Sequence, residues 1–211
     1  MAELLASWTI TISREMGSMG GEIGRQLGHS LGFRVVGHDL INQAARRAGT
    51  PEAALAAIDE LGLLGMCPSE EACLAYRTTV EQIMQEMANE GNVVIIGRAG
   101  QVILSGWPRS LHLRLIAPAQ IRTERISRRL KISLDAAHAQ ITVSDRFRKN
   151  YLKRFYNVNW NSPELYDLVV NTAHLDADAA TDIVLHSLHQ FQTSAQKSLV
   201  DQPDGYVNHI G

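Results

Sequence analysis

The glycine-rich run 17–21, Gly-Ser-Met-Gly-Gly, contains the residues best suited to chemistry. It follows an alternating run of β-forming residues, 7–13, and leads into an amphipathic segment, 20–31. A strand, a glycine turn and a helix in this order can hold an anion, because the backbone N–H groups of the turn converge and the helix N-terminus adds partial positive charge. The run predicts a phosphate-binding turn. The alternative is an ordinary turn whose glycines only permit tight packing.

The turn departs from the standard phosphate-loop pattern GxxxxGK[ST], in which the lysine reaches the outer phosphates and the hydroxyl holds Mg²⁺. When the strand and the helix are aligned, Gly20 stands at the lysine position, and Glu22, one residue past Gly21, is the side chain nearest to the hydroxyl position. Positive charge on a bound phosphate must then come from elsewhere in the chain. Arg14, which lies just before the turn, is one candidate.

Two further candidates follow apolar runs that are typical of strands. Arg98 comes after the continuous apolar run 92–96, which is the pattern of a central parallel strand buried on both faces. Ligands bind at the carboxyl edge of open α/β sheets, and the planar fork of a guanidinium suits a phosphate. The alternative for Arg98 is a structural ion pair. Asp39, after the short run 33–36, is either a ligand contact or the N-cap of the next helix.

Basic residues are concentrated between positions 122 and 154. This segment holds ten of the twenty Lys and Arg residues against three acids, Glu124, Asp135 and Asp145. The ten are Arg122, Arg125, Arg128, Arg129, Lys131, Arg146, Arg148, Lys149, Lys153 and Arg154. Like charges at helical spacing repel unless an anion screens them, so the excess indicates an anionic partner. The alternative is a solvated helix face.

The overall composition excludes several classes of protein. The chain has 211 residues with 45% hydrophobic and 20% charged residues, which is ordinary for a globular domain. Its net charge of −2 does not favour a nucleic-acid partner. No stretch approaches the length of a membrane span, and the N-terminus lacks a basic region followed by an apolar run. We therefore expect a cytoplasmic protein that does not bind a membrane.

The elements that must position these residues alternate between strands and helices. The patterns predict strands at 7–13, 33–36, 92–96, 111–117 and 166–171. They predict helices at 20–31, 40–48 and 68–89, one that ends at 105, two that begin at 118 and 133, and a loop with a final helix from 172 to about 194. This alternation indicates a mostly parallel sheet with helices on both faces. The oligomeric state stays open: the helix 68–89 could serve a homodimer, although a place in the core suits it better.

The chain resembles nucleoside monophosphate kinases, and more closely the cytidylate kinase-like family of bacterial proteins, over about residues 7–190. The resemblance rests on ISREMGSMGGEIGRQL, GRAGQVIL, SDRFRKNYLKRFYNVNW and YDLVVNT. It implies an α/β P-loop fold, which is a three-layer αβα sandwich with a five-stranded parallel sheet and an inserted helical lid. It further implies ATP as donor, Mg²⁺ and a small nucleotide as acceptor. We expect one domain over 1–197 with the lid at about 122–160, followed by a loosely ordered tail, 198–211.

Together, the residues and the resemblance predict three groups of site residues. The predicted catalytic cations are Arg14, Arg98, Arg148, Lys153 and Arg154. The predicted donor-binding residues are Gly17, Ser18, Met19, Gly20, Gly21 and Glu22, of which Ser18 and Glu22 are the Mg²⁺ ligands. The predicted acceptor-binding residues are Asp39, Arg98, Arg146 and Tyr151. Tyr151 falls near the lid Asp with which cytidylate kinases read the sugar, and Ala99 stands where their Arg is followed by Asp.

Three functions follow from these features. The first is transfer of the γ-phosphoryl group of ATP to a nucleoside monophosphate, with CMP or dCMP as the expected acceptor, or to another small acceptor. The second is nucleotide binding with little or no catalysis, because loss of a cation that stabilises the transition state can cost several kcal/mol of barrier. The third is nucleic-acid binding through the basic segment 122–154, which predicts a steep dependence of affinity on salt.

Overall fold

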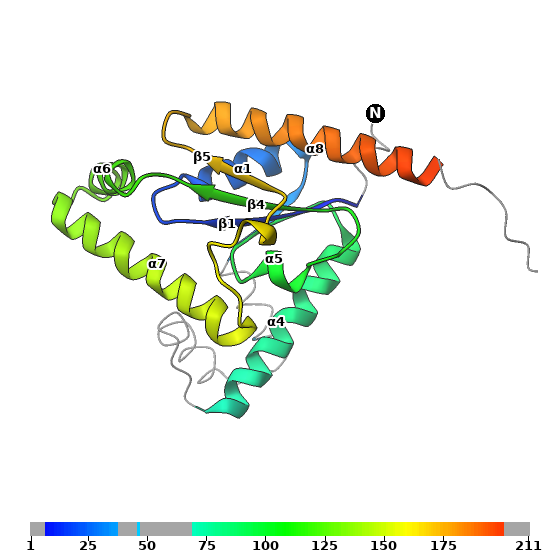
Figure 1. Cartoon of the computed structure of the whole chain (residues 1–211), viewed down its shortest axis with the longest axis horizontal. Helices are drawn as coiled ribbons and strands as arrows, with labels where there is room; N and C mark the ends of the chain where they lie inside the picture. Colours follow the sequence, from blue (N-terminus) through cyan, green and yellow to red (C-terminus); the bar gives the residue numbers. More distant parts are fainter. Residues whose placement is uncertain (1–6, 38–45, 47–68, 201–211) are drawn as a thin grey trace, which may run out of the picture.

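A parallel sheet of five strands forms the centre of the computed structural model, which describes residues 7–37, 46 and 69–200 (Figure 1). The strand order is β2-β3-β1-β4-β5. The strands are β1 (Thr9–Arg14), β2 (Arg34–Val36), β3 (Val93–Ile96), β4 (Ser110–Ile116) and β5 (Leu168–Asn171). β1 lies between β3 and β4, so its carboxyl end is at the middle of the sheet edge.

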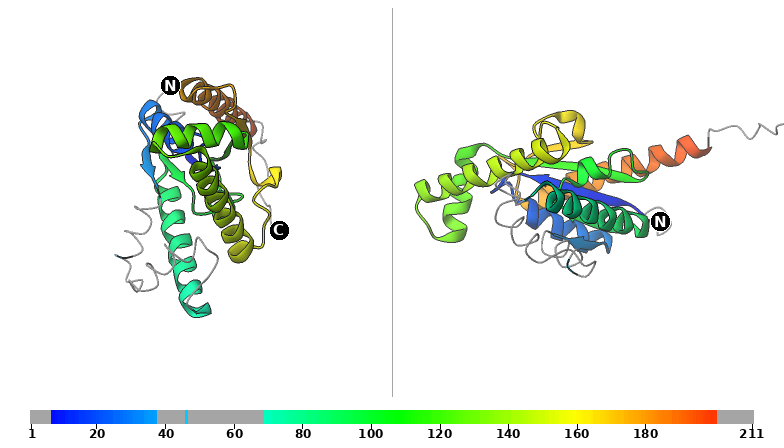
Figure 2. Two further views of the ribbon diagram at one scale, coloured as in Figure 1. Left: turned by 90° about the vertical axis from the view of Figure 1, so that its left-hand side faces the viewer. Right: turned by 90° about the horizontal axis from the view of Figure 1, so that it is seen from below.

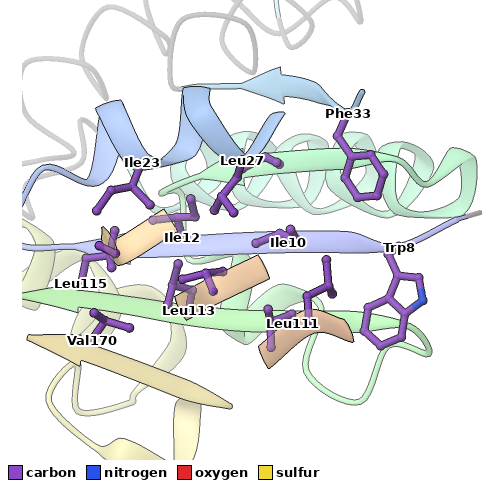
Figure 3. Packing of buried hydrophobic residues seen from close by; sticks show 14 of the residues in the cluster. Trp8, Ile10, Ile12, Ile23, Leu27, Phe33, Leu111, Leu113, Leu115 and Val170 are labelled. Atoms are coloured by element: carbon purple, nitrogen blue, oxygen red, sulfur yellow. The ribbon is translucent and has the colours of Figure 1, made fainter. Parts of the chain in front are cut away.

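One face of the sheet is covered by α1 (Gly20–Leu31) and α8 (Ala177–Val200), which lie side by side. Ile23 and Leu27 of α1 point toward Ile10 and Ile12 of β1 (Figure 3). The spacing of four residues places both α1 side chains on one helix face, which is why this helix docks on the sheet. The resulting core also contains Leu111, Leu113, Leu115 and Val170.

The opposite face is covered by α4 (Glu70–Glu90) and the short α5 (Gly100–Ile103). Tyr76, Val80 and Met84 of α4 are buried against Val93 and Ile95 of β3. Because β3 is apolar on both faces, it can pack against helices from either side, as parallel strands at the centre of a sheet do. The result is three layers: two helical layers and the sheet between them.

A helical hairpin, α6 (Ala119–Leu130) and α7 (Leu134–Tyr156), projects from one end of the sheet (Figure 2). The Ser133 hydroxyl caps α7 by accepting a hydrogen bond from the Ala136 N–H at 3.2 Å. The α7 helix ends at Asn157, which is in the left-handed conformation, and the chain returns through the 3₁₀ helix η3 (Pro163–Leu165) to β5. This hairpin contains the basic segment and lies beside the carboxyl ends of the strands.

The predicted three-layer α/β fold with a five-stranded parallel sheet is confirmed. The strand ends differ from prediction by one or two residues, the helix after β3 ends at Ile103, and the last helix runs to Val200, into the predicted tail. The predicted helix 40–48 and Asp39 lie outside the described residues. Among the helices that the structure describes, none combines the length and the apolar character needed to cross a bilayer.

Gly28 is the residue at which α1 packs closely on β2. This close contact leads to a prediction about stability. A Cβ atom there would overlap Val35 Cγ2 and lie 3.0 Å from the Phe33 carbonyl oxygen. We expect Gly28→Ala to lower the free energy of unfolding by about 1–3 kcal/mol, as overpacking does. Urea denaturation of the wild type and the variant measures this difference in the free energy of unfolding.

The matched control is Gly21→Ala in the same helix, where a Cβ would meet no atom within 4 Å. This change should not destabilise the protein, because Ala is the better helix former by about 1 kcal/mol. Equal stability of the two variants would contradict the packing assigned to Gly28.

Candidate functional site

The turn between β1 and α1 lies against the hairpin. Gly17 has a φ of 89°, and a Cβ on it would lie 2.9 Å from both the Cβ and the carbonyl oxygen of Arg122 in α6. A side chain at this position would therefore separate the turn from α6. No side chain caps the N-terminus of α1. The partial positive charge of that helix end thus stays available to an anion.

Ser18 does not occupy the place predicted for a metal ligand. Its side chain is fully buried, and its hydroxyl donates to the Glu15 carbonyl oxygen at 2.8 Å. The hydroxyl therefore stabilises the turn from inside and does not line the groove beside it. Glu22 does line that groove, so of the two predicted Mg²⁺ ligands only Glu22 faces the site.

The first cavity, which we call the donor groove, has a volume of about 690 Å³ and lies between the turn and the hairpin. Its floor includes Gly17, Met19, Gly20 and Gly21. Its lining contains two acids, Glu15 and Glu22, and six arginines: Arg14, Arg25, Arg125, Arg128, Arg129 and Arg148. This excess of positive charge over a glycine-rich turn suits a polyphosphate.

The second cavity, which we call the acceptor cavity, has a volume of about 240 Å³ and lies at the carboxyl end of β3. It is lined by Arg98, Gln101, Tyr151 and Trp160, among others. The Arg98 guanidinium lies over the Tyr76 ring, 5.6 Å from its centroid. Burial raises the pKa of Tyr151, so this side chain stays a neutral phenol at neutral pH. The cavity thus combines a cation with aromatic walls.

The two cavities meet at Arg14 and Arg148, which line both of them. Burial and the neighbouring charges of Arg148 and Arg98 lower the pKa of Arg14 to about 9. Arg14 is therefore still protonated at pH 7, within a cluster of like charges. Burial also lowers the pKa of Arg148, although Asp145 opposes that shift. An anion bound at this junction would relieve the repulsion among the guanidinium groups.

Asp145 holds the hairpin against the turn. Its Oδ1 accepts the Met16 N–H at 3.0 Å and lies 3.3 Å from Arg148 Nη1, while its Oδ2 lies 2.6 Å from Arg122 Nη1. Arg122 also lies 3.3 Å from Glu15 Oε2. These charged contacts join the turn, α6 and α7, and they orient Arg148 toward the cavities.

Arg125 makes a second connection between the hairpin and the sheet. Its Nη2 donates to the Thr172 carbonyl oxygen at 2.6 Å, and its Nη1 donates to Thr172 Oγ1 at 3.0 Å. Thr172 follows β5 directly, and its hydroxyl donates to the Ile116 carbonyl oxygen at 3.2 Å. The far wall of the donor groove is therefore fixed to the ends of β4 and β5.

The structure brings only part of the predicted set together. Lys153, Arg154 and Arg146 are exposed and line neither cavity. Lys153 donates to Asn157 Oδ1 at 2.7 Å, and the Arg146 guanidinium lies 5.9 Å from the Phe147 ring centroid. Of the four lid cations predicted as site residues, Arg148 is the one that lines a cavity, and Arg125, Arg128 and Arg129 of the lid line the donor groove as well. The reason is helical geometry: α7 turns one face toward the cavities, and Lys153, Arg154 and Arg146 lie off that face.

Several residues that line the acceptor cavity were not predicted. Gln101 follows Arg98 closely in GRAGQ, so its place after a buried strand was a usable signal. Ser13 had a similar signal, because it lies at the carboxyl end of β1 next to Arg14. Trp160 had none, because it comes after the hairpin and reaches the cavity through the tertiary fold. Trp160 Nε1 donates to Ser13 Oγ at 2.8 Å, and this contact closes the cavity on one side.

Among the residues that the structure describes, one carboxylate of the site is suited to Mg²⁺. The described residues contain no group of three His, Cys, Asp or Glu side chains that could hold a metal ion. Mg²⁺ in phosphoryl-transfer sites is held by one or two carboxylates together with substrate phosphates and water. Glu22 in the donor groove fits that requirement, whereas Glu15 is engaged with Arg122.

Comparison with known proteins assigns the chain to a family of kinases. A model of the cytidylate kinase-like family matches residues 9–174. The cytidylate kinase of Archaeoglobus fulgidus is 27% identical over 198 residues, which cover 92% of this chain and 98% of the relative. The cytidylate kinase of Methanocaldococcus jannaschii is 32% identical over 107 residues, and this match covers 50% of the chain and only 60% of the relative's length.

Solved structures agree on the fold. An uncharacterized protein from Eubacterium ventriosum has a TM-score of 0.70 at 21% identity, with coverage of 86% of this chain and 98% of that one. A shikimate kinase from Acinetobacter baumannii, solved with shikimate, has a TM-score of 0.52 at 14% identity, with coverage of 90% and 98%. At these identities the likeness establishes a shared P-loop kinase fold.

The Asp145 contacts predict that the hairpin loses stability when this carboxylate is neutralised. Asp145→Asn should lower the free energy of unfolding by about 1.5–3 kcal/mol, because charged hydrogen bonds to Arg122 and Arg148 are weakened in a partly buried place. Chemical denaturation measures the loss. The control is Asp135→Asn in the first turn of α7, which is exposed and should cost less than about 1 kcal/mol. If both changes cost the same, Asp145 does not anchor the hairpin.

Proposed function

The chain belongs to the cytidylate kinase-like family, and we propose that it transfers the γ-phosphoryl group of ATP to a nucleoside monophosphate, with CMP or dCMP as the expected acceptor. The observation that carries this proposal is the meeting of the donor groove and the acceptor cavity at Arg14 and Arg148. A transferring phosphoryl group must be reached from both sides, by the donor and by the acceptor. A junction lined by two guanidinium groups is suited to that position.

The reaction needs little covalent participation from the protein. An oxygen of the acceptor phosphate forms a bond to the γ-phosphorus, and the bond from that phosphorus to the β–γ bridging oxygen breaks. The electron pair stays with the bridging oxygen, so ADP leaves and the monophosphate becomes a diphosphate. Arg14 and Arg148 stabilise the charge on the transferring oxygens, and the closed hairpin excludes water that would otherwise hydrolyse ATP.

The donor and the acceptor would be held by different parts of the chain. The triphosphate lies over the glycine turn and the start of α1, with Arg125, Arg128 and Arg129 of α6 on its far side. Mg²⁺ bound with ATP neutralises phosphate charge, and Glu22 is the residue of this chain that would hold it. The phosphate of the acceptor nucleotide would contact Arg98, and the base of that nucleotide would lie against Tyr151 and Trp160. Residues 1–197 would act as one domain with 122–160 as its lid.

Nucleotide binding with little catalysis is the second candidate, and the absence of a turn lysine is the observation that favours it. Gly20 stands at that position, so the cation that most P-loop kinases hold against the outer phosphates is missing from α1. A third outcome is transfer to a different small acceptor, since Ala99 and Tyr151 differ from the pattern of cytidylate kinases. Assays over several acceptors separate the three.

An ADP-release assay over nucleoside monophosphates and small hydroxylated acids tests the proposal. We expect turnover with CMP or dCMP. Arg98→Ala should lower kcat/KM for the acceptor by about 10- to 150-fold, the equivalent of one charged hydrogen bond, and should leave the Kd for ATP unchanged. The control is Arg34→Ala on β2, which removes a surface ion pair with Glu90 of α4, and Arg34 lines neither cavity.

Two results would contradict the proposal. ATP binding without turnover for every acceptor would favour the binding protein. Turnover with an unchanged kcat/KM in Arg98→Ala would remove this residue from the acceptor site and leave the acceptor cavity unassigned.

A further inference from the structure

We propose that the Arg14 guanidinium replaces the missing turn lysine and reaches the γ-phosphoryl group from the end of β1 instead of from α1. This inference rests on the proposed function, because it names the cation that contacts the transferring group. It is more specific than a general excess of arginine in the groove. One arginine, Arg14, takes both the space and the role of the missing lysine.

The space at Gly20 is the first observation. A Cβ on Gly20 would lie 2.6 Å from Arg14 Cβ and 2.7 Å from Arg14 Cγ. The Arg14 side chain therefore starts its path in the volume that a side chain at the lysine position would enter first. The two residues are mutually exclusive in this arrangement. A glycine at position 20 is what Arg14 requires, and it explains why the lysine is absent.

The end of the Arg14 side chain is the second observation. A Cβ on Gly97 would overlap Arg14 Nη1 and lie 3.2 Å from Arg14 Cζ. The guanidinium is thus seated on Gly97, next to Arg98 at the carboxyl end of β3. Arg14 therefore extends from the turn, across the start of α1, to the acceptor side of the site. Two glycines on different elements leave room for this path.

The charge around Arg14 is the third observation. Within the part of the chain that the structure describes, no carboxylate lies within 4.0 Å of its guanidinium, and it makes no hydrogen bond. Arg148, by contrast, is 3.3 Å from Asp145 Oδ1. Arg14 lies between the positive charges of Arg148 and Arg98, and it lines both cavities. Among the described residues no carboxylate balances this cation at that distance, so an anion bound at the junction would do so.

The substitution also changes the chemistry. A lysine ammonium is a compact charge, whereas a guanidinium offers a planar fork that can donate to two phosphate oxygens at once. Because Arg14 reaches toward Arg98, its fork can contact an oxygen of the γ-phosphoryl group while staying next to the acceptor phosphate. In a P-loop kinase the lysine charge lies on the donor side. Here the charge of Arg14 lies between the donor and the acceptor.

A swap of the two positions tests the inference. We compare the wild type, Arg14→Ala, the double variant Arg14→Gly with Gly20→Lys, and the surface control Arg34→Ala. The double variant removes the side chain that blocks position 20 and restores the standard lysine. Calorimetry with ATP and with ADP gives a readout that does not depend on turnover or on the acceptor, because only ATP carries the γ-phosphoryl group.

Arg14→Ala should weaken ATP binding by about 10- to 150-fold and ADP binding by less than about threefold. Its kcat should fall by about 10²- to 10³-fold, as when one donor to a transition-state oxyanion is removed. The double variant should regain at least tenfold in ATP affinity over Arg14→Ala. Thermal denaturation confirms that each variant is folded.

Equal losses of ATP and ADP affinity in Arg14→Ala would overturn the inference, as would ATP affinity and kcat that match the wild type. A folded double variant with the ATP affinity of Arg14→Ala would overturn it too. These results are distinguishable from failure of the proposed function, in which the wild type binds ATP but turns over no acceptor. In that case the ratio of ATP to ADP affinity still decides the role of Arg14.

Discussion

Repulsion among arginines at the carboxyl edge of the sheet is the constraint on which the rest of the structure depends. Arg14, Arg98 and Arg148 come from the end of β1, the end of β3 and the middle of α7, and they converge on the junction of two cavities. Burial strengthens this repulsion, because it removes the water that would screen the charges. The fold must supply enough packing energy and enough carboxylates elsewhere to hold these cations in place.

The carboxylates are distributed unevenly, and this unevenness defines the site. Asp145 and Glu15 balance Arg122 and Arg148 and join the turn to the hairpin. Arg114 is also balanced, since its Nη2 lies 3.7 Å from Glu15 Oε1, and it donates hydrogen bonds to Asn161 and Tyr166. Charges that serve the architecture are thus paired within the protein. Arg14, by contrast, has no carboxylate within 4.0 Å among the described residues, and it lies at the place where a phosphoryl group would transfer.

The architecture was predictable because its signals are local. The alternation of strands and helices, and the unbroken apolar run of β3, determine a parallel sheet with helices on both faces. The glycine turn and Arg98 could be singled out for the same reason, since each follows a strand whose carboxyl end lies at the sheet edge beside the cavities. The position of each lid cation was not predictable in this way: Arg148 lines both cavities, whereas Lys153, Arg154 and Arg146 are exposed and line neither. Their charge is visible in the sequence, but the rotation of α7 about its axis is set by packing.

The sequence by itself determined the fold class, the family and the fact that the turn has no lysine. It also determined that Ser18 follows Gly17, but only the tertiary structure decided that this hydroxyl is buried and bonded to Glu15. The path of Arg14 was likewise decided only in three dimensions. It depends on the space left by Gly20 and Gly97, which come from separate elements and meet because β1 and β3 are neighbours in the sheet. The spacing of residues along the chain does not predict this proximity of Gly20 and Gly97, because the pairing between strands depends on the packing of the whole domain.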